Sequence, residues 1–343
     1  MTPAAVGAIT VDPWDPGYAT SLTAEALAEL DATSAELDLS VELPAARWRP
    51  ITPAAAPGGP VLVADGVRRI EARVWINGLD DGMPSPGIAA SYAAGLVRCE
   101  PGTGGLARLT SVDVRRSIFS PSSQSNEIHT WAGSYASFRA RDGSAEQLSL
   151  ALQRQLTALE VEVATEYRAA IDEDELLIVD GPLRGRTQLP RTVGYIKAHH
   201  AGYLPDLQSD IVGALRPGQR TPVFLMGTSW RRYSWYLRLP TRSAAPWAGI
   251  ARCEASTTLS QEAVTALADH ATGAIQTLAG VDYKDPRAPQ NLIPVGGLER
   301  LLRHRLGDAG VLYRALLAAT ADGASTASAD GTPAGRPRSA SDS

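Results

Sequence analysis

The chain has 343 residues, of which 44 % are hydrophobic and 20 % are charged, and its formal net charge is −5. This composition is typical of a globular protein, and no apolar run reaches the roughly 18 residues that a membrane-spanning helix needs. Cys99 and Cys253 are too few for a disulfide framework or a thiolate zinc site, and the first residues do not read as a secretory signal. We therefore expect a cytoplasmic protein with no membrane association.

The charges are distributed unevenly along the chain. Residues 12–42 hold eight acids and no base, whereas residues 211–253 hold seven arginines and no acid. Residues 181–205 are also free of acids and contain four bases. Because phosphate binding depends on a local positive patch, both basic segments are candidates for contact with nucleic acid. The alternative is that these bases are scattered over a solvated surface.

The two ends of the chain differ in composition from its middle. Leucines at helical spacing predict a helix over residues 23–38, and a segment rich in proline and alanine follows it. We therefore assign residues 1–54 to an N-terminal helix and linker, and residues 55–320 to the main domain. Residues 321–343 are of low complexity and lack large apolar side chains, so we expect a disordered tail.

The main domain begins with segments that have the character of β-strands. The expected strands cover residues 61–65, 69–76, 88–99 and 106–119. The pair Asp65-Gly66 follows the first apolar run, and it predicts a turn or bulge before the second strand. The first part of the domain is therefore expected to be an antiparallel meander.

Helices and strands alternate in the rest of the domain. A leucine stripe predicts a helix over 144–170, and the apolar run LLIVD at 176–180 predicts a buried strand that ends on an aspartate. The later expected elements are a helix at 204–215, strands at 222–226 and 247–256, a helix at 259–279, one from about Pro294, and one at 308–320. Antiparallel strands followed by alternating elements is the order of the ribonuclease H-like fold. The predicted fold is thus α/β, with a mixed sheet flanked by helices.

Acidic residues stand at three places in this order. Asp65 and Asp180 each end an apolar strand, and Glu160, Glu162 and Glu166 lie on the helix between them. Mg²⁺ and Mn²⁺ prefer hard oxygen ligands, and two such ions about 4 Å apart can activate water and stabilise a leaving phosphate oxygen. Either Asp-Gly pair alone is ordinary turn chemistry, but two pairs that each close a buried strand favour a metal site.

These segments resemble the NurA family of nucleases, which accompany the HerA ATPase in DNA end processing. The resemblance is carried by the Asp-Gly pair at 65–66, the glutamate-bearing helix and the segment LLIVDGPL at 176–183. RTVGYIKAHH at 191–200 resembles the strand and lysine that follow the second aspartate of the family. The block at 284–308 resembles the C-terminal block of an actinobacterial-type branch. Together the matches cover about residues 55–318.

The resemblance implies that Asp65 and Asp180 bind Mn²⁺ or Mg²⁺, with a helical glutamate as the third ligand. Glu160 lies near the edge of the apolar stripe, whereas Glu162 has the separation from Asp180 that is nearest to the family pattern, so both stay candidates. Glu166 is the third choice. All three lie within one helix, and the spacing alone does not decide between them.

The sequence also departs from the family pattern. Val67 stands where the family has a serine, and Ile293 precedes Pro294 where the family has a tyrosine. His304 is nearby but does not align with the family's histidine. The residues that could substitute are Asp285, Arg287, Gln290 and Asn291, of which Asp285 is a candidate fourth acid and metal ligand. These departures motivate an alternative function, a non-catalytic DNA-binding or adaptor protein with the same fold.

Basic side chains supply the expected contacts with DNA. Lys197 lies on a strand-like segment and is a candidate to stabilise the scissile phosphate. The candidate DNA-binding arginines are Arg184, Arg186, Arg191, Arg231 and Arg232. The segment RRYSWYLRLP at 231–240 either stacks single-stranded bases or forms an edge strand with core aromatics.

The leading hypothesis is a metal-dependent deoxyribonuclease. The resemblance implies 5′-to-3′ exonuclease or single-strand endonuclease activity in DNA end processing and double-strand break repair. It also implies a homodimer that binds a HerA-type ATPase.

Overall fold

The computed structural model describes most of the chain. The described residues are 36–54, 59–76, 84–100, 107–123, 125–171, 175–197, 203–228, 230–243, 247–281 and 285–329. They form a mixed α/β structure whose strands make one mixed sheet in the order β1-β9-β10-β11-β8-β7-β2-β3-β4-β6-β5. Among these residues, no helix combines the length and the apolar character that crossing a bilayer requires.

The chain divides into two compact units. Unit 1 contains residues 1–68, 92–114 and 152–305, and unit 2 contains residues 69–91, 115–151 and 306–343. Three long strands and one long helix contribute residues to both units, so the division does not follow the order of the sequence. Each unit is described by itself below.

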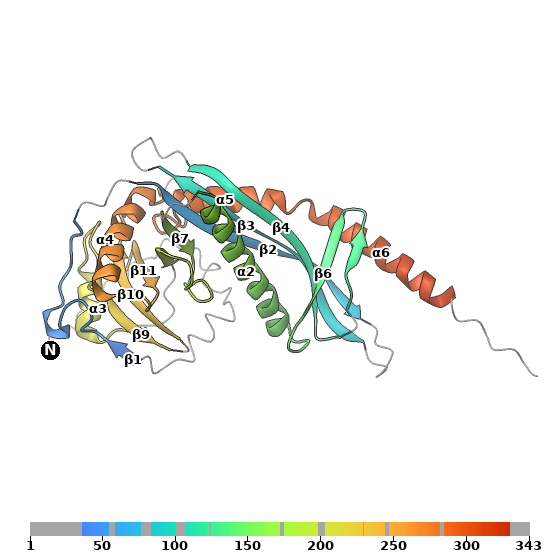
Figure 1. Cartoon of the computed structure of the whole chain (residues 1–343), viewed down its shortest axis with the longest axis horizontal. Coiled ribbons are helices and arrows are strands. Elements are labelled where there is room, and N and C mark those ends of the chain that lie inside the picture. The colour runs from blue at the N-terminus through green and yellow to red at the C-terminus, as the bar shows by residue number, and fades with distance from the viewer. Residues whose placement is uncertain are drawn as a thin grey trace, which may run out of the picture. The chain divides into compact units, whose positions relative to one another are not determined.

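The sheet of unit 1 combines parallel and antiparallel pairs. Its strands are β1 (Glu36–Asp38), β9 (Phe224–Gly227), β10 (Arg231–Arg238), β11 (Ile250–Ala255), β8 (Thr192–Ile196), β7 (Leu176–Asp180) and parts of β2 (Val61–Ile76), β3 (Ser85–Cys99) and β4 (Ala107–Ser120). β7 is parallel to both β2 and β8, whereas the pairs from β8 through β11, β10 and β9 to β1 are antiparallel. Figure 1 shows β9, β10 and β11 side by side in this order. The parallel centre is apolar, as expected for strands that are buried on both faces.

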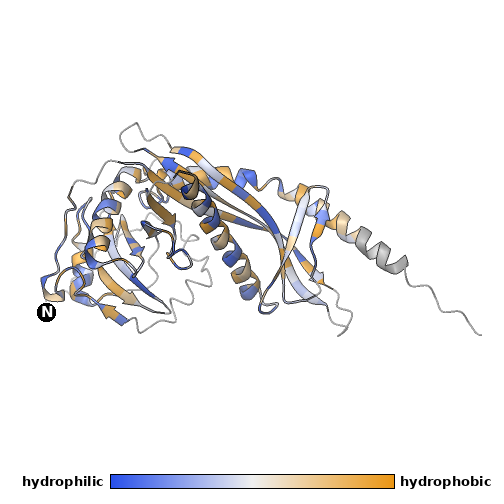
Figure 2. Cartoon of the chain, in the orientation of Figure 1, coloured by the Kyte–Doolittle hydropathy of each residue, from blue (hydrophilic) through white to orange (hydrophobic). Residues whose placement is uncertain are grey.

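Helices flank this sheet. They are η1 (Ala45–Arg47), α2 (Ala145–Ile171), α3 (Asp206–Gly213), α4 (Gln261–Leu278) and α5 (Ile293–Arg305). The side chain of Ser260 caps α4 by accepting a hydrogen bond from the amide of Ala263. Figure 2 shows blue and orange stretches alternating along α2, as expected for a helix with one apolar side.

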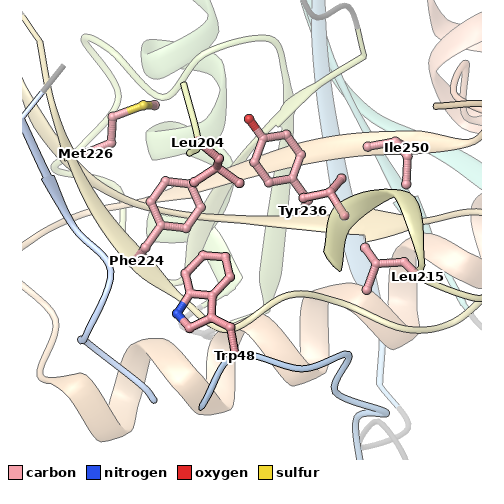
Figure 3. Packing of buried hydrophobic residues seen from close by; sticks show 8 residues of the cluster. Trp48, Leu204, Leu215, Phe224, Met226, Tyr236 and Ile250 are labelled. Atoms are coloured by element: carbon pink, nitrogen blue, oxygen red, sulfur yellow. The ribbon is translucent and has the colours of Figure 1, made fainter. Parts of the chain in front are cut away.

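An aromatic core lies between the N-terminal segment and the antiparallel half of the sheet. Trp48 packs on Phe224, which stacks on Tyr236, with ring centroids 5.7 and 6.1 Å apart (Figure 3). Burying such rings contributes about 1.5–3 kcal/mol each. Trp48 comes from the predicted linker, and it anchors this segment to unit 1. The described residues 36–54 are therefore an integral part of the sheet unit and not a separate linker.

Unit 2 has a smaller core. It holds β5 (Ile128–Thr130), β6 (Gly133–Arg139) and α6 (Ala309–Ala329), together with its shares of β2, β3, β4 and α2. β6 is parallel to β4 and antiparallel to β5. Ala89, Ile118, Tyr135 and Leu316 form its buried cluster. Leu316 places α6 against the strands of this unit.

Most predicted elements are confirmed, but four predictions are wrong. Strands 61–65 and 69–76 form one continuous strand without a turn at Gly66. Residues 36–38 form a strand because Leu37 pairs with Met226; the rest of the predicted helix 23–38 lies outside the described residues. Residues 321–329 continue α6, and the rest of the predicted tail lies outside the described residues. β10 pairs on both sides, so the segment 231–240 does not form an edge strand.

Candidate metal centre

Two parallel strands bring Asp65 and Asp180 together. Ala64 of β2 is paired with Val179 of β7, so Asp65 and Asp180 occupy the next equivalent positions on neighbouring strands. Residues at equivalent positions of parallel strands point to the same face. The sequence-based prediction that these two aspartates converge is confirmed.

The opposite face of β2 at this point is covered by α2. A Cβ atom added to Gly66 would lie 2.5 Å from Glu160 Oε1 and 2.6 Å from Leu156 Cδ1, which is too close for any side chain. Gly66 is therefore required by the close approach of the helix and not by a turn. Because successive residues of a strand point to opposite faces, Asp65 points away from α2.

The third acid of the cluster comes from α5. Asp65, Asp180 and Glu299 each offer one carboxylate oxygen, and these oxygens all lie within 4.8 Å of one another. Asp65 is buried, whereas the side chains of Asp180 and Glu299 are each 15 % exposed. Solvent and ions can therefore reach the cluster from the side of Asp180 and Glu299.

The carboxyl group of Asp65 has an unusual environment. Burial, followed by the negative charge of Asp180, raises the pKa of Asp65 well above its usual value of 3.8; Glu160 and Glu299 add to this effect, and Lys197 opposes it. Its Oδ2 atom is buried and has no hydrogen-bond partner within the described part of the chain. A buried oxygen of this kind is costly unless a ligand such as a cation occupies the space beside it.

A chain of hydrogen bonds leads from Asp180 to the loop before α5. Lys197 Nζ donates to Asp180 Oδ2 at 2.6 Å and to Asn291 Oδ1 at 2.8 Å. Asn291 Nδ2 in turn donates to Asp285 Oδ2 at 2.6 Å. Lys197 is buried, and this chain fixes its ammonium group beside the carboxylate of Asp180. Lys197 is thus a fixed positive charge beside the two aspartates, and its role at a scissile phosphate stays a prediction.

Asp285 has a supporting place in this arrangement. Burial alone would raise its pKa, but hydrogen bonds from Asn291 and Arg287 lower it below the usual value. Arg287 also pairs with Glu299, with NH2 3.1 Å from Oε2. Asp285 is not among the three acids whose oxygens converge, so the structure does not bring it into the centre as a ligand. It orients Asn291 and Arg287 instead.

The helical glutamates do not join the cluster. Glu160 is buried on the α2 side and forms an ion pair with Arg186. Glu162 is half-buried and Glu166 is exposed. The structure therefore does not bring a glutamate of α2 into the group of converging oxygens, because the side chain of Asp65 lies on the other face of the sheet from α2. Among the described residues, the third acid beside the two aspartates is Glu299.

The five predicted DNA-binding arginines fall into two groups. Arg184, Arg191 and Arg231 are exposed, and Arg191 contacts His270 Nδ1 at 3.0 Å. Arg186 and Arg232 are buried in ion pairs with Glu160 and Glu254. These two guanidinium groups hold the fold together, so the structure does not place them on a surface that could contact DNA. Trp235 and Tyr236 are buried core residues, so the structure does not place their rings where they could stack on bases.

A buried charge network supports the segment that follows Asp180. Glu254 Oε1 accepts hydrogen bonds from Arg232 Nε at 2.7 Å and from Arg252 NH2 at 3.1 Å. Glu254 Oε2 accepts the amide of Leu183 at 3.1 Å. All three charged side chains are nearly inaccessible to solvent. The network therefore ties the loop after β7 to β10 and β11.

Gly194 controls the same loop from β8. A Cβ atom at this position would lie 2.7 Å from the backbone nitrogen of Leu183 and 3.0 Å from the carbonyl oxygen of Gly181. We expect Gly194→Ala to lower the free energy of unfolding by about 1–3 kcal/mol, because backbone atoms cannot move aside without distorting the loop. Urea unfolding measures the change. Gly213→Ala is the matched control, because a Cβ atom there meets nothing within 4 Å. Equal stability of the two variants would contradict this packing argument.

Glu299 is the residue of the candidate centre that the sequence did not indicate, whereas Asn291 is one of the possible substitutes for the family's missing residues. Both lie in the block 284–308, and the useful signal was the density of polar residues before and within a predicted helix. No pattern in the sequence indicates which side of the sheet α5 covers. The position of Glu299 therefore depends on a tertiary contact that spacing alone does not give.

The donor atoms of the candidate centre suit a hard divalent cation. The donor set is hard, made of carboxylate oxygens, and the buried oxygen of Asp65 has no protein partner among the described residues. Both features fit a divalent cation such as Mg²⁺ or Mn²⁺. No protein-family model matches the chain, and a search of curated proteins returns no match.

Proposed function

We propose that the chain is a metal-dependent nuclease that hydrolyses phosphodiester bonds of DNA with Mn²⁺ or Mg²⁺. The observation that carries this proposal is the buried, unpartnered Oδ2 of Asp65 beside the carboxylates of Asp180 and Glu299. These three residues would hold the metal. When bound, it would supply an activated water molecule and offset the negative charge that develops on the phosphate.

The other groups at the centre have supporting roles. Lys197 is fixed by Asp180 and Asn291, so its ammonium group can stabilise negative charge on a phosphate without reorganising. Asn291 and Asp285 hold this lysine in place, and Arg287 orients Glu299. Catalysis thus depends on groups from β2, β7, the end of β8 and α5.

The finer assignment rests on the sequence. The Asp-Gly pairs, the strand with Lys197 and the block 284–308 support membership of the NurA family with a ribonuclease H-like fold. The parallel pairing of β2 with β7, each with an aspartate at the centre, is compatible with this fold. A homodimer, a HerA-type ATPase partner and a role in DNA end processing belong to the same proposal. Glu299 in place of a glutamate from the long helix is a departure from the expected pattern.

A cleavage assay tests the proposal directly. Labelled single- and double-stranded DNA is incubated with the full chain in Mn²⁺, in Mg²⁺ and in chelator. We expect cleavage with either metal and none with chelator. Glu299→Gln should reduce the rate by about a hundredfold or more, because one of three ligands loses its charge.

The control for this assay is Glu162→Gln, which changes an acid of α2 outside the cluster. It should keep the rate of the wild-type chain. A loss of activity in Glu162→Gln with normal activity in Glu299→Gln would overturn the assignment of the third ligand. DNA binding without cleavage in any metal would favour the adaptor function.

A further inference from the structure

A cavity lies next to the candidate metal centre in unit 1. Its volume is about 480 Å³, and it is formed by residues of the segment 285–292, by Gly280 and Val281, and by one side of α5. A volume of this size falls in the range of small-molecule sites in proteins. The cavity borders the centre, because Glu299 lines the cavity and also belongs to the acid cluster, and Asn291 lines the cavity and accepts a hydrogen bond from Lys197.

The charged residues of the cavity are not balanced. Asp285 and Glu299 are both engaged by Arg287. Arg300 and Arg303 add two further positive charges from α5, at positions that lie one turn apart on the same side of the helix. Within the described residues, Arg300 Nε donates to the carbonyl oxygen of Gly296 alone, at 3.2 Å. Neither arginine forms an ion pair with an acid in the described part of the chain, so their guanidinium groups are available to an anion.

The same wall of the cavity carries apolar side chains. Ile293 is 52 % exposed although it is a large aliphatic residue, and it lies two turns before Arg300 on α5. Half-buried Val281 continues this apolar surface into the cavity, and the fully buried Leu292 lies behind it. An apolar surface beside a pair of arginines is complementary to a nucleotide, whose flat base is apolar on its faces and whose phosphate is anionic.

We propose that this cavity binds one nucleotide unit, with its phosphate on Arg300 and Arg303 and its base against Ile293. The proposal rests on the proposed function, because a nucleic acid strand whose scissile phosphate lies at Glu299 would place a neighbouring nucleotide in the cavity. Arg300 and Arg303 then determine how the strand is held and not how the bond is broken. They are binding residues distinct from the five arginines that the sequence suggested.

Isothermal titration calorimetry in chelator tests the cavity without any contribution from the metal. The ligands are thymidine 5′-monophosphate, inorganic phosphate and thymidine, each titrated into the full chain. We expect the nucleotide to bind with a Kd in the millimolar range or tighter, and more tightly than either part alone. Arg300→Ala and Arg303→Ala should each weaken this binding by about tenfold, because a charge-assisted hydrogen bond is lost. Arg305→Ala, which removes the same charge from the exposed end of α5 outside the cavity, should leave the Kd unchanged.

The outcomes separate this proposal from the proposed function. Binding of the nucleotide by a chain that cleaves no DNA would support the cavity and overturn the nuclease. Suppose instead that the chain cleaves DNA but binds no nucleotide in chelator, and that the three arginine variants have equal KM. This outcome would support the nuclease and overturn the cavity. Equal affinity for inorganic phosphate and the nucleotide would overturn the role of Ile293 and the base. An equal loss of affinity in Arg305→Ala would show that only net charge matters, and it would overturn the site.

Discussion

For the proposed metal-dependent nuclease, we expect the variant Asp65→Asn to lose both the stabilisation by Mn²⁺ and the cleavage of DNA. A metal that is present at 100 times its Kd stabilises the folded chain by about 2.7 kcal/mol. Asp65 supplies the buried oxygen of the centre, so its neutral amide analogue should remove most of this effect. The cleavage rate should fall by about a thousandfold or more, because the metal contributes several kcal/mol to the transition state. Thermal unfolding with and without Mn²⁺, together with the cleavage assay, measures both losses.

The same variant should be more stable than the wild-type chain when no metal is present. Burial and the charge of Asp180 raise the pKa of Asp65 above its usual 3.8, so the folded state holds a proton that the unfolded state has released. The stability contributed by the protonated form is therefore complete below about pH 3.8 and is lost as the pH rises through the higher folded-state pKa. Asp65→Asn should remove this part of the pH dependence. Metal affinity in the wild-type chain should rise over the same interval, because binding requires the ionised carboxylate.

Asp210→Asn is the control for these measurements, because Asp210 is an exposed acid on α3, outside the cluster. It should change neither the response to Mn²⁺ nor the pH dependence by more than about 0.5 kcal/mol. If Asp65→Asn keeps the full stabilisation by Mn²⁺, the metal binds elsewhere and the centre is wrongly placed. If it is less stable than the wild-type chain in chelator across the pH range, the unpartnered oxygen is not a source of instability.

The second large effect is expected for Glu254→Gln, which should destabilise the fold without touching the metal centre. Glu254 is the shared partner of Arg232 and Arg252, and all three side chains are nearly inaccessible to solvent. Removing the one negative charge leaves two buried guanidinium groups facing a neutral amide, and breaking a buried pair in this way costs about 3–5 kcal/mol. The melting temperature should fall by on the order of 10 °C for a unit of this size. Differential scanning calorimetry measures the fall.

Glu262→Gln provides the comparison, since Glu262 is an exposed acid on α4 and should contribute less than about 0.5 kcal/mol. A double-mutant cycle with Arg232→Met isolates the pair: removing both partners should restore part of the lost stability. If the two single changes add without any coupling, the ion pair does not contribute and the stability comes from packing alone. If Glu254→Gln has the same melting temperature as the wild-type chain, the network does not support the loop at Leu183.

The proximity of Asp65 and Asp180 could be predicted from the sequence because its signal is local. An apolar run that ends on an acid reports a buried strand and its exit, and two such runs on parallel neighbours must bring Asp65 and Asp180 together. The third acid could not be found in this way. The spacing on α2 places Glu160 relative to its own helix, but it does not say which face of the sheet that helix covers.

Gly66, beside Asp65, also shows that the local sequence does not reveal tertiary contacts. Asp-Gly after an apolar run is common turn chemistry, and nothing in the local sequence distinguishes a turn from a continuing strand. Here Gly66 gives room to Leu156 and Glu160, which are about 90 residues away along the chain. Of the five arginines predicted to bind DNA, three are exposed and two are buried in ion pairs. A run of basic residues in the sequence does not show which side chains face inwards. Arg232 has its acid partner 22 residues later, on the next strand of the sheet.

Lys197 affects how the chain folds when no metal is bound. Its ammonium group lies 2.6 Å from Asp180 and acts as a resident counter-ion for one of the three converging carboxylates. The chain therefore carries its own partial substitute for a divalent cation. In the proposed nuclease, folding would not have to wait for metal, and an ion that arrives later would enter a site that is already assembled. The supply of metal would then regulate activity while the amount of folded protein stays constant.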